Sequence, residues 1–322
     1  MLPALVLTAG FGTRLAPLTN VRAKPAVPVA GVPLVRRVLR WLARQGVQLA
    51  VLNLHHKPDT ITGVVGHGDE IGIRVRYSWE PTILGSAGGP RQALSLLGHR
   101  FFIVNGDTLT DLNLSDLEKT HNRTGADVTL AVTDTPDPTR YGGVAVDAQG
   151  FAVGFRPPGQ SARHFVGVQL AESTVFRDLH PGEPAVTIGG LYDRMIEQGT
   201  QRIATHEVTA AFHDMGTPAD YLTASLAVGR AEGRDTLPVG DRCRVHPSAV
   251  LTRTILWDDV TVAEDCRLTD CIVADGVQLP ARTECSRMVV VAGPEGPSFV
   301  SLDGGQRVRD PRLGVMRSDS KI

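Results

Sequence analysis

The sequence predicts an α/β fold in which a Rossmann-like, mixed but mostly parallel sheet carries helices on both faces and is followed by a short β-helix. Short apolar runs alternate with helical patterns over residues 1–232, and this alternation is typical of parallel sheets. Aliphatic residues then recur on six-residue steps within residues 238–295, a pattern typical of β-helix coils. We therefore predict two domains over these ranges and a polar tail over residues 296–322.

The size and composition of the chain fit this division. Its 322 residues are enough for about two domains, and a net charge of −1 argues against nucleic acid or a membrane surface as the main partner. The sequence shows no basic leader and no apolar run of membrane-spanning length, so we expect a cytoplasmic protein. The four cysteines form no Cys-x-x-Cys pair, which favours buried free thiols over a zinc site.

The first strand, over residues 4–7, and the loop after it form the most informative stretch. Small residues in such a loop let backbone N–H groups approach an anion, and a helix N-terminus after the loop would add donors. The alternative is a plain glycine turn with surface cations, because the loop is neither a Walker A motif nor a complete dinucleotide fingerprint. For binding a polyphosphate, the loop has small residues at Ala9, Gly10 and Gly12 and a hydroxyl at Thr13. Arg14 and Lys24 add two fixed positive charges.

The run Thr8-Ala9-Gly10-Phe11-Gly12-Thr13-Arg14-Leu15, followed by Lys24-Pro25, resembles the signature of the sugar-1-phosphate nucleotidylyltransferases. The two motifs at this spacing are far more specific than either one alone. The resemblance implies an enzyme that transfers a nucleotidyl group from a nucleoside triphosphate to a sugar 1-phosphate and releases pyrophosphate. It covers nearly the whole chain and is firmest over residues 2–107 and around Asp214.

The elements that follow continue the alternation of helix and strand. The pattern predicts helices over residues 33–46 and 59–65 and strands over residues 49–54 and 74–78. The adjacent His55 and His56 would point to opposite faces of an extended segment, which argues against a shared metal ion. Ligands of such sheets bind beyond the carboxyl ends of the strands, so we expect the first loop to lie in the site.

A run of small residues, Gly85-Ser86-Ala87-Gly88-Gly89, precedes a helix predicted over residues 90–97. Such a run lets a flat group lie against the backbone, although a plain turn explains it equally well. It resembles the family's Leu-Gly-Thr-Ala-Gly segment, which contacts the nucleotide base. The resemblance therefore implies nucleotide contacts at Gly85, Ala87 and Gly88.

The strand predicted over residues 101–107 ends in a carboxylate, Asp107. An acid at this position needs a partner or a function, and capping of the next turn is the alternative. Asn105-Gly106-Asp107 resembles the family segment whose aspartate binds Mg²⁺, a hard cation that takes carboxylate and phosphate oxygens together. The run Asp214-Met215-Gly216-Thr217-Pro218 resembles the family's Asp-Val-Gly-Thr-Pro motif, which implies that Asp214 is a second Mg²⁺ ligand. Thr217 and Pro218 also suit the start of a helix over residues 219–230.

A helix over residues 114–124 and a strand over residues 127–133 lead to the predicted sugar side, and a later helix is expected over residues 188–198. Tyr141-Gly142-Gly143-Val144 and the strand over residues 164–170 resemble the family's Tyr-Gly-Val-Val and Thr-Gly-Ile strands. The resemblance implies sugar-phosphate contacts at Gly142, Arg156 and Gly167.

The chain departs from the family's Glu-Lys-Pro motif, because Phe155 and Arg156 replace the glutamate and the lysine. An arginine fork can bind a phosphate at two points, with an exposed loop arginine as the alternative. A phenylalanine cannot hold sugar hydroxyls, which puts the identity of the sugar in question.

The C-terminal repeat resembles the left-handed hexapeptide-repeat domain that many of these enzymes carry. Val239, Val245 and Leu251 keep the six-residue step, whereas Ile255 and Leu256 break it. We expect about three coils, with an ordinary small β domain as the alternative. Because coils need neighbours to bury their ends, we expect this domain to stack on the catalytic domain or to form a homo-oligomer with a second subunit.

The residues fit the implied reaction, because a sugar phosphate is already an anionic nucleophile and catalysis is then mainly positioning and charge neutralisation. The resemblance implies that Asp107 and Asp214 hold Mg²⁺, Arg14 steadies the leaving phosphates, Lys24 neutralises charge between the substrates and Arg156 holds the sugar phosphate. The likeness is greatest to mannose-1-phosphate guanylyltransferases, which implies GTP and mannose 1-phosphate. The alternatives are heptose-phosphate guanylyl, uridylyl or thymidylyl specificity, a non-catalytic regulatory subunit that binds a nucleotide-sugar, and a dinucleotide-dependent oxidoreductase, which the incomplete glycine fingerprint disfavours.

Overall fold

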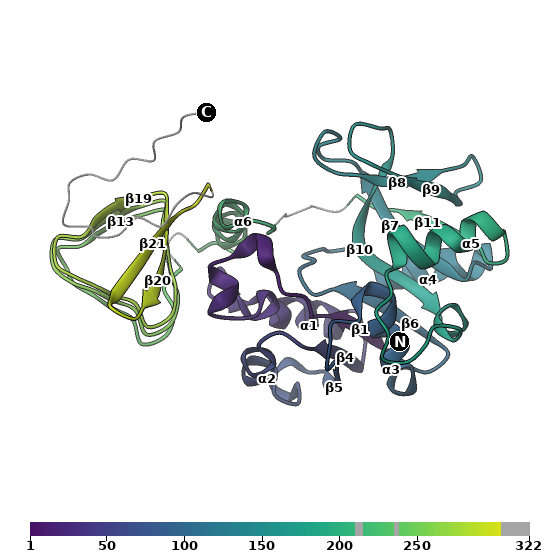
Figure 1. Cartoon of the computed structure of the whole chain (residues 1–322), viewed down its shortest axis with the longest axis horizontal. Coiled ribbons are helices and arrows are strands. Elements are labelled where there is room, and N and C mark those ends of the chain that lie inside the picture. The colour runs from purple at the N-terminus through teal and green to yellow at the C-terminus, as the bar shows by residue number, and fades with distance from the viewer. Residues whose placement is uncertain (210–214, 235–237, 304–322) are drawn as a thin grey trace. The chain divides into compact units, whose positions relative to one another are not determined.

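The computed structural model describes residues 1–209, 215–234 and 238–303 (Figure 1). The chain forms two compact units, each of which is built from two separate stretches of sequence. The first, which we call the sheet unit, comprises Met1–Gly10 and Val35–His213. The second, which we call the β-helix unit, comprises Phe11–Leu34 and Asp214–Ile322. The segment Phe11–Leu34, which lies inside the predicted range 1–232, therefore clusters with the C-terminal part of the chain.

The sheet unit is built on a mixed, mostly parallel sheet with the strand order β11-β7-β10-β6-β1-β4-β5. Strand β1 pairs in parallel with β4 and β6, and β4 pairs in parallel with β5. Strand β10 runs antiparallel to its neighbours β6 and β7. The strands are β1 (Ala4–Leu7), β4 (Leu49–Leu54), β5 (Arg74–Trp79), β6 (Arg100–Asn105), β7 (Val128–Asp134), β10 (Arg163–Glu172) and β11 (Ile203–Glu207).

The connections between the parallel strands place helices on both faces of this sheet, as predicted. The chain passes outward from β1 through β4 to β5, and then crosses back over both to reach β6. Helices α3 and α5 pack in the buried cluster that contains Leu5 and Ile103. Helices α1, α2 and α4 cover the opposite face, where His121 of α4 meets Thr129 of β7. The helices are α1 (Leu34–Arg44), α2 (Pro58–Val65), α3 (Gly85–Leu97), α4 (Leu114–Thr124) and α5 (Tyr192–Gln198).

The core of the sheet unit consists of aliphatic and aromatic side chains between the sheet and its helices. Leu5, Phe101, Ile103 and Phe176 are fully buried in one such cluster. Strands β8 (Gly143–Val146) and β9 (Ala152–Arg156) form an antiparallel pair joined to the sheet through β10. Of the residues predicted to lie on the sugar side, Arg156 ends β9, Gly142 directly precedes β8 and Gly167 lies in β10.

Two local expectations for the sheet unit are corrected. Helix α3 begins at Gly85 rather than at residue 90, so the run of small residues forms its first turns and Pro90 lies inside it. The helix predicted from residue 188 begins at Tyr192, because Ile188 and Gly189 have non-helical backbone angles.

The β-helix unit begins with the segment Phe11–Leu34 packed on helix α6 (Pro218–Ala231). Strands β2 (Pro28–Val29) and β3 (Val32–Pro33) form a small hairpin whose turn has Ala30 at φ 46°. This conformation is costly for alanine. Side chains of the α6 region hold the turn, because the Ser225 Oγ accepts from the Ala30 N–H at 2.8 Å and Arg234 donates to the Ala30 carbonyl at 2.6 Å.

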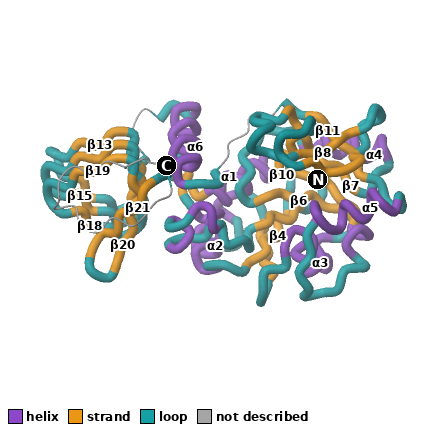
Figure 2. The backbone as a smooth tube through the Cα atoms, turned by 45° about the horizontal axis from the view of Figure 1, so that its top comes forward, coloured by secondary structure: helices purple, strands orange, loops and turns teal. Residues whose placement is uncertain are grey.

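The rest of this unit is a β-helix with three flat sides of short parallel strands (Figure 2). Residues on adjacent coils are 17 positions apart, as in the Arg242–Asp259 pair, because one side is a residue shorter than the other two. That shorter side contains Ile255 and Leu256, which explains why they break the six-residue step. The handedness of the coil stays a prediction. The strands are β12 (Arg244–Val245), β13 (Val250–Thr252), β14 (Ile255–Leu256), β15 (Thr261–Val262), β16 (Arg267–Thr269), β17 (Ile272–Val273), β18 (Gln278–Leu279), β19 (Glu284–Ser286) and β20 (Met288–Gly293).

Aliphatic and sulfur-containing side chains fill the interior of the coil. The free thiols of Cys266, Cys271 and Cys285 are buried there, as predicted, whereas Cys243 is half-buried. An additional strand, β21 (Gly296–Ser301), pairs with β20 and buries Phe299. The predicted polar tail therefore contributes a strand before residue 304. Among the helices that the structure describes, none has the length and apolar composition needed to cross a membrane.

Candidate active site

The candidate site lies where the order of the parallel strands reverses. The chain leaves β1 toward β4 on one side and returns to β6 on the other, and ligands of open α/β sheets bind at the carboxyl ends of the strands at such a switch point. The Gly106 N–H donates to the Leu7 carbonyl at 2.9 Å. This hydrogen bond joins the ends of β6 and β1, so the start of the first loop and the turn with Asp107 lie at one edge.

The turn after β6 also brings Gly167 to this edge. Thr108 donates its hydroxyl to the Val166 carbonyl at 3.1 Å. Gly167 has φ +84°, and a Cβ added there would lie 2.3 Å from the Thr108 Oγ1 and 2.9 Å from the Asn105 Nδ2. Only glycine fits this contact. The structure therefore groups the predicted metal ligand Asp107 with the predicted sugar-side residue Gly167.

A buried network of hydrogen bonds supports the same edge, and its residues are not among the predicted site residues. The Asn53 Oδ1 accepts from the Thr8 N–H at 2.6 Å, and the Asn53 Nδ2 donates to the Glu80 Oε1 at 2.7 Å. The second carboxylate oxygen of Glu80 accepts from the Leu84 N–H at 2.9 Å. Glu80 is fully buried, and such a carboxylate must be hydrogen-bonded. These hydrogen bonds fix the ends of β1, β4 and β5 relative to the start of α3.

The positions of Asn53 and Glu80 in the sequence could have revealed this hydrogen-bond network. Asn53 and Glu80 stand at or directly after the ends of the strands predicted over residues 49–54 and 74–78, next to the predicted site. A polar residue at such a strand end resembles Asp107 in position. The side chains of Asn53 and Glu80 hold neighbouring backbone groups in place. Asp107 lies half-buried at the edge.

The small residues at the start of α3 pack against a neighbouring segment of the chain. The Ala185 carbonyl accepts hydrogen bonds from the Ala87 and Gly88 N–H groups at 2.9 and 3.1 Å. A Cβ on Gly85 would lie 2.6 Å from that same oxygen, and one on Gly88 would lie 2.6 Å from the Glu183 carbonyl. Backbone packing thus explains Gly85 and Gly88 without a ligand, and nucleotide contacts here stay a prediction.

The remaining part of the glycine loop belongs to the β-helix unit. The loop enters the 3-10 turn η1 (Thr13–Leu15), and the first α-helix begins only at Leu34, so the expected helix N-terminus after the loop is wrong. Gly12 has φ +61°, and a Cβ there would lie 2.9 Å from the Thr19 Cγ2 and 3.0 Å from the Lys24 Cβ. Gly12 therefore lets the loop fold directly onto Lys24.

The side chains that this loop offers differ in exposure. Thr13 and Arg14 are exposed, as Gly10 is in the sheet unit, whereas Ala9 is buried and Lys24 is half-buried. Exposed donors and a nearby cation suit the binding of a mobile polyphosphate. Asp214, the second predicted metal ligand, lies outside the described residues.

The predicted sugar-phosphate residues Gly142 and Arg156 are neighbours on the β8–β9 pair. A Cβ on Gly142 would lie 2.5 Å from the Arg156 carbonyl, and the Arg156 side chain is exposed. The side chain of Phe155 packs against the hydrophobic core of the sheet unit. The phenylalanine therefore has a structural role at the position where the family's motif has a glutamate.

A metal ion is compatible with this edge of the sheet. Asp107 offers a half-buried carboxylate at the switch point, and Mg²⁺ binds through one or two carboxylates together with substrate phosphates. Among the described residues, no group of three or more His, Cys, Asp or Glu side chains could form a complete protein cage. The donor set therefore fits a metal that shares its ligands with a nucleotide.

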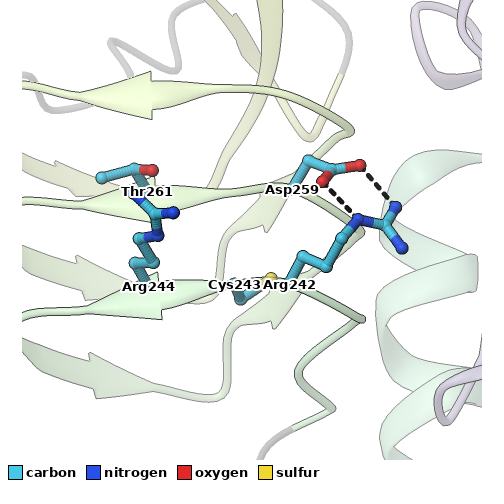
Figure 3. Close-up of a pocket in the computed structure, with 5 residues that line it drawn as sticks. All are labelled: Arg242, Cys243, Arg244, Asp259 and Thr261. Carbon is cyan, nitrogen blue, oxygen red and sulfur yellow. Dashed lines mark hydrogen bonds and ion pairs between the residues drawn. The ribbon is translucent and has the colours of Figure 1, made fainter.

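A pocket of about 470 Å³ lies on the β-helix and is lined by Arg242, Cys243, Arg244, Asp259 and Thr261 (Figure 3). Arg242 donates two hydrogen bonds to the carboxylate of Asp259, at 2.6 and 2.7 Å. The charge of Arg242 is thereby neutralised, which leaves Arg244 as the other charged side chain that lines the pocket.

Sequence comparisons match most of this chain to known proteins. The family model described as nucleotidyl transferase matches residues 3–230. The chain is 29% identical to a mannose-1-phosphate guanylyltransferase of Mycobacterium tuberculosis, over 86% of this chain and 81% of that protein. It is 26% identical to a UTP–glucose-1-phosphate uridylyltransferase of Synechocystis, over 80% of this chain and 71% of that protein.

A solved structure resembles this chain in fold. The crystal structure of HddC from Yersinia pseudotuberculosis complexed with GMP-PN superposes with a TM-score of 0.62 at 24% identity. The match covers 71% of this chain and all of the other. At this identity the likeness concerns the fold alone.

Proposed function

The chain belongs to the nucleotidyl transferase family, and on that premise we propose that it transfers a guanylyl group from GTP to mannose 1-phosphate. The coarser activity, nucleotidyl transfer to a sugar 1-phosphate, follows from the family and its named relatives. The choice of GTP and mannose is supported by the guanylyltransferase relative. The uridylyltransferase relative keeps UTP and glucose 1-phosphate as the alternative pair.

The observation that carries the proposal is the junction of β1 and β6. One hydrogen bond, from the Gly106 N–H to the Leu7 carbonyl, places the carboxylate turn of Asp107 beside the start of the glycine loop. A nucleotide whose phosphates follow that loop would bring its α-phosphate toward Asp107. Gly167 packs on the same turn, so the proposed sugar-side residue lies beside the carboxylate turn.

The proposed reaction is an in-line displacement at the α-phosphorus. A phosphate oxygen of the sugar 1-phosphate forms the new P–O bond, and the bond from the α-phosphorus to the bridging oxygen breaks. The electron pair leaves with pyrophosphate, and no proton transfer is needed because the attacking oxygen is already ionised. The barrier is therefore mainly the approach of two anions, which fixed positive charge lowers.

The chain supplies this charge from several elements. We propose that Arg14 and the loop N–H groups bind the β- and γ-phosphates, that Lys24 neutralises charge between the substrates, and that Arg156 binds the sugar phosphate. Asp107 and Asp214 would hold Mg²⁺, which when bound neutralises charge on the nucleotide phosphates. The packing of Phe155 against the core assigns recognition of the sugar hydroxyls to other groups.

Pyrophosphate release tests the proposal directly. The full chain would be incubated with Mg²⁺, each of GTP, UTP, ATP and dTTP, and mannose, glucose or heptose 1-phosphate. We expect the highest kcat/KM with GTP and mannose 1-phosphate, and loss of activity with EDTA that added Mg²⁺ reverses. A preference for another pair would overturn the specificity. No release with any pair, together with tight binding of a finished nucleotide-sugar, would indicate a regulatory subunit.

A further inference from the structure

One arginine joins the segment of the glycine loop to the β-helix. Arg22 lies between the loop and Lys24, and its guanidinium donates from Nε and Nη2 to both carboxylate oxygens of Asp275, at 2.6 and 2.7 Å. The same Nη2 lies 2.5 Å from an oxygen of Asp258. Two-point Arg–carboxylate pairs of this kind combine strength with fixed geometry. The β-helix thus holds a residue only two positions before Lys24.

The two carboxylates that receive Arg22 are fixed by the β-helix itself. Asp258 and Asp275 occupy equivalent positions on adjacent coils, where strands lie about 4.8 Å apart. The Asp258 N–H donates to the Asp275 Oδ1 at 3.1 Å, and the Asp241 N–H donates to the Asp258 Oδ1 at 2.8 Å. Two carboxylates this close repel each other unless a cation lies between them. The coil therefore presents a rigid, preorganised receptor for one guanidinium.

The surroundings of Arg22 strengthen this attachment. Its side chain is 14% exposed, and the guanidinium carbon lies 5.5 Å from the ring centre of the buried Trp257. Burial alone would lower the pKa of Arg22, but the hydrogen bonds and charges of Asp275 and Asp258 outweigh it and raise the pKa. A partly buried, shared ion pair is screened by salt much less than a surface pair.

Short backbone contacts connect Arg22 to the residues of the glycine loop. The Arg22 N–H donates to the Leu18 carbonyl at 3.2 Å, and the Ala26 N–H donates to the Ala23 carbonyl at 2.8 Å. These bonds close two tight turns on either side of Arg22. Because Gly12 packs directly on Lys24, a displacement of Arg22 would move both Lys24 and the loop that carries Arg14.

A second connection reaches the far end of the same segment. The Trp257 Nε1–H donates to the Tyr221 hydroxyl at 3.0 Å, and that hydroxyl donates to the Pro28 carbonyl at 2.5 Å. Burial raises the pKa of Tyr221, which keeps the hydroxyl protonated and able to donate. Trp257 precedes Asp258 in the chain, so one corner of the β-helix holds the segment at two points.

We propose that Arg22 is a positioning residue, through which the β-helix sets the geometry of Arg14 and Lys24 for the nucleotide. The proposal rests on the proposed function, because it concerns how the loop serves nucleotidyl transfer. It assigns the β-helix a part in the reaction that is distinct from any role in oligomerisation. Misplacement of a loop by about 1 Å can cost about 100-fold in rate.

The test compares the kinetics of three variants of the full chain. In Arg22→Met the stem remains and the charge is lost. We expect kcat/KM for the nucleotide to fall by about 10- to 100-fold and KM for the sugar phosphate to stay unchanged. Arg22→Lys keeps the charge without the two-point geometry and should recover only part of the loss. Wild-type kinetics for Arg22→Met would overturn the proposal.

A triple variant separates positioning from charge imbalance. Arg22→Met leaves two adjacent carboxylates without a cation, which could by itself disturb the coil. Arg22→Met combined with Asp258→Asn and Asp275→Asn removes that repulsion. We expect this triple variant to keep the wild-type melting temperature and the kinetic defect of Arg22→Met. Full recovery of kcat/KM in the triple variant would show that only charge imbalance was at work and would overturn the proposal.

The chain offers a matched control for the ion pair itself. Arg242 makes a similar two-point pair with Asp259, the residue after Asp258, at 2.6 and 2.7 Å. Here, however, both partners belong to the β-helix coil. Arg242→Met should leave the kinetic constants of the nucleotide unchanged. An equal loss of kcat/KM in Arg242→Met would mean that the β-helix pairs act through stability alone, against the proposal.

Hydrogen exchange distinguishes failure of this inference from failure of the proposed function. If the wild-type chain releases no pyrophosphate with any substrate pair, the proposed function fails. The amide protection of peptides within residues 11–34 still tests the attachment. We expect faster exchange there in Arg22→Met than in the wild type and in Arg242→Met. Equal exchange in all three proteins would overturn the positioning role.

Discussion

In the sheet unit close approaches of the backbone place the predicted site residues, whereas in the β-helix unit a partly buried ion pair holds the segment that carries them. Asp107 and Gly167 come together because Gly106 and Gly167 allow main-chain and side-chain atoms to approach where no Cβ would fit. The segment with Lys24 is instead held by the guanidinium of Arg22 on the carboxylates of Asp258 and Asp275.

This difference predicts different sensitivities in the two units. A site held by close backbone approach is disturbed by one added methyl group and is indifferent to a lost charge nearby. A site held by a partly buried ion pair tolerates small changes of shape but responds when one partner is removed. The predictions below use this contrast, starting from the largest expected effect.

The largest effects are expected from the residues proposed to act on the substrates, one from each unit. Asp107→Ala and Lys24→Ala should each lower kcat by about 10²–10³, because each removes a preorganised charge from the reaction. Steady-state pyrophosphate release measures the loss, and circular dichroism checks that the variants are folded. The exposed pair Asp116 and Lys119, 2.8 Å apart on α4, provides controls as Asp116→Ala and Lys119→Ala. Near-normal turnover in either test variant would contradict the assignment of that residue.

A single methyl group should distinguish the two kinds of construction. Gly167→Ala places a Cβ 2.3 Å from the Thr108 Oγ1 at φ +84°. We expect about 1–3 kcal/mol of destabilisation from the clash, in addition to the cost of a left-handed alanine, together with a lower kcat. Urea unfolding and pyrophosphate release measure the two effects.

Gly159 provides the matched control for this substitution. It has a similar φ of +88°, but a Cβ there would meet nothing within 4 Å. Gly159→Ala should therefore cost only the conformational term of about 1–2 kcal/mol and leave kcat unchanged. If the two alanine variants were equally stable and equally active, the close approach at Gly167 would have no role in holding the site.

Loss of the buried hydrogen bonds of Glu80 should have an intermediate effect on stability. Glu80→Ala leaves the Asn53 amide and the Leu84 N–H without their acceptor, at a cost of about 1–3 kcal/mol for each unsatisfied group. Glu80→Gln keeps one acceptor and should cost less. Thermal or urea unfolding of both variants measures the difference. A Glu80→Ala variant as stable as the wild type would show that this chain does not support the edge.

The sequence predicted those parts of the site that depend on local pattern. Apolar runs located β1, β4 and β6, and the rule for strand ends placed Asp107 and the start of the loop at one edge of the sheet. The six-residue step likewise identified the β-helix. These features repeat within a few residues, so a single sequence is enough to show them.

The parts that could not be predicted depend on contacts between residues far apart in the chain. Arg22 meets Asp275 across 253 positions, and the six-residue step marks neither residue. The carbonyl of Ala185 occupies the N–H groups at the start of α3, which the small residues alone could not indicate. A 17-residue rather than a six-residue period would have aligned Asp258 with Asp275 and pointed to a receptor for a cation.

The smallest expected effect is a pH dependence confined to the sheet unit. His121 is 1% exposed, with its Nδ1 2.8 Å from the Thr129 hydroxyl and its Nε2 3.2 Å from the Glu172 carboxylate. Burial lowers its pKa, with Glu172 opposing the shift. Its pKa in the unfolded chain is about 6.5. Above that pH the imidazole is neutral in both states. Below it the unfolded chain takes up a proton that the folded chain does not, so the free energy of unfolding falls as the pH decreases.

Urea unfolding of the full chain between pH 7.5 and 5.5 measures this slope. His121→Gln cannot titrate, so we expect a shallower slope than in the wild type, even if the variant is less stable at pH 7.5. Burial also lowers the pKa of His206 in the same unit. The His206→Gln variant measures how much His206 contributes to the pH dependence of unfolding. Identical slopes in the wild type and His121→Gln would contradict the burial of a neutral imidazole, and a slope that persisted in both histidine variants would place the pH sensitivity outside them.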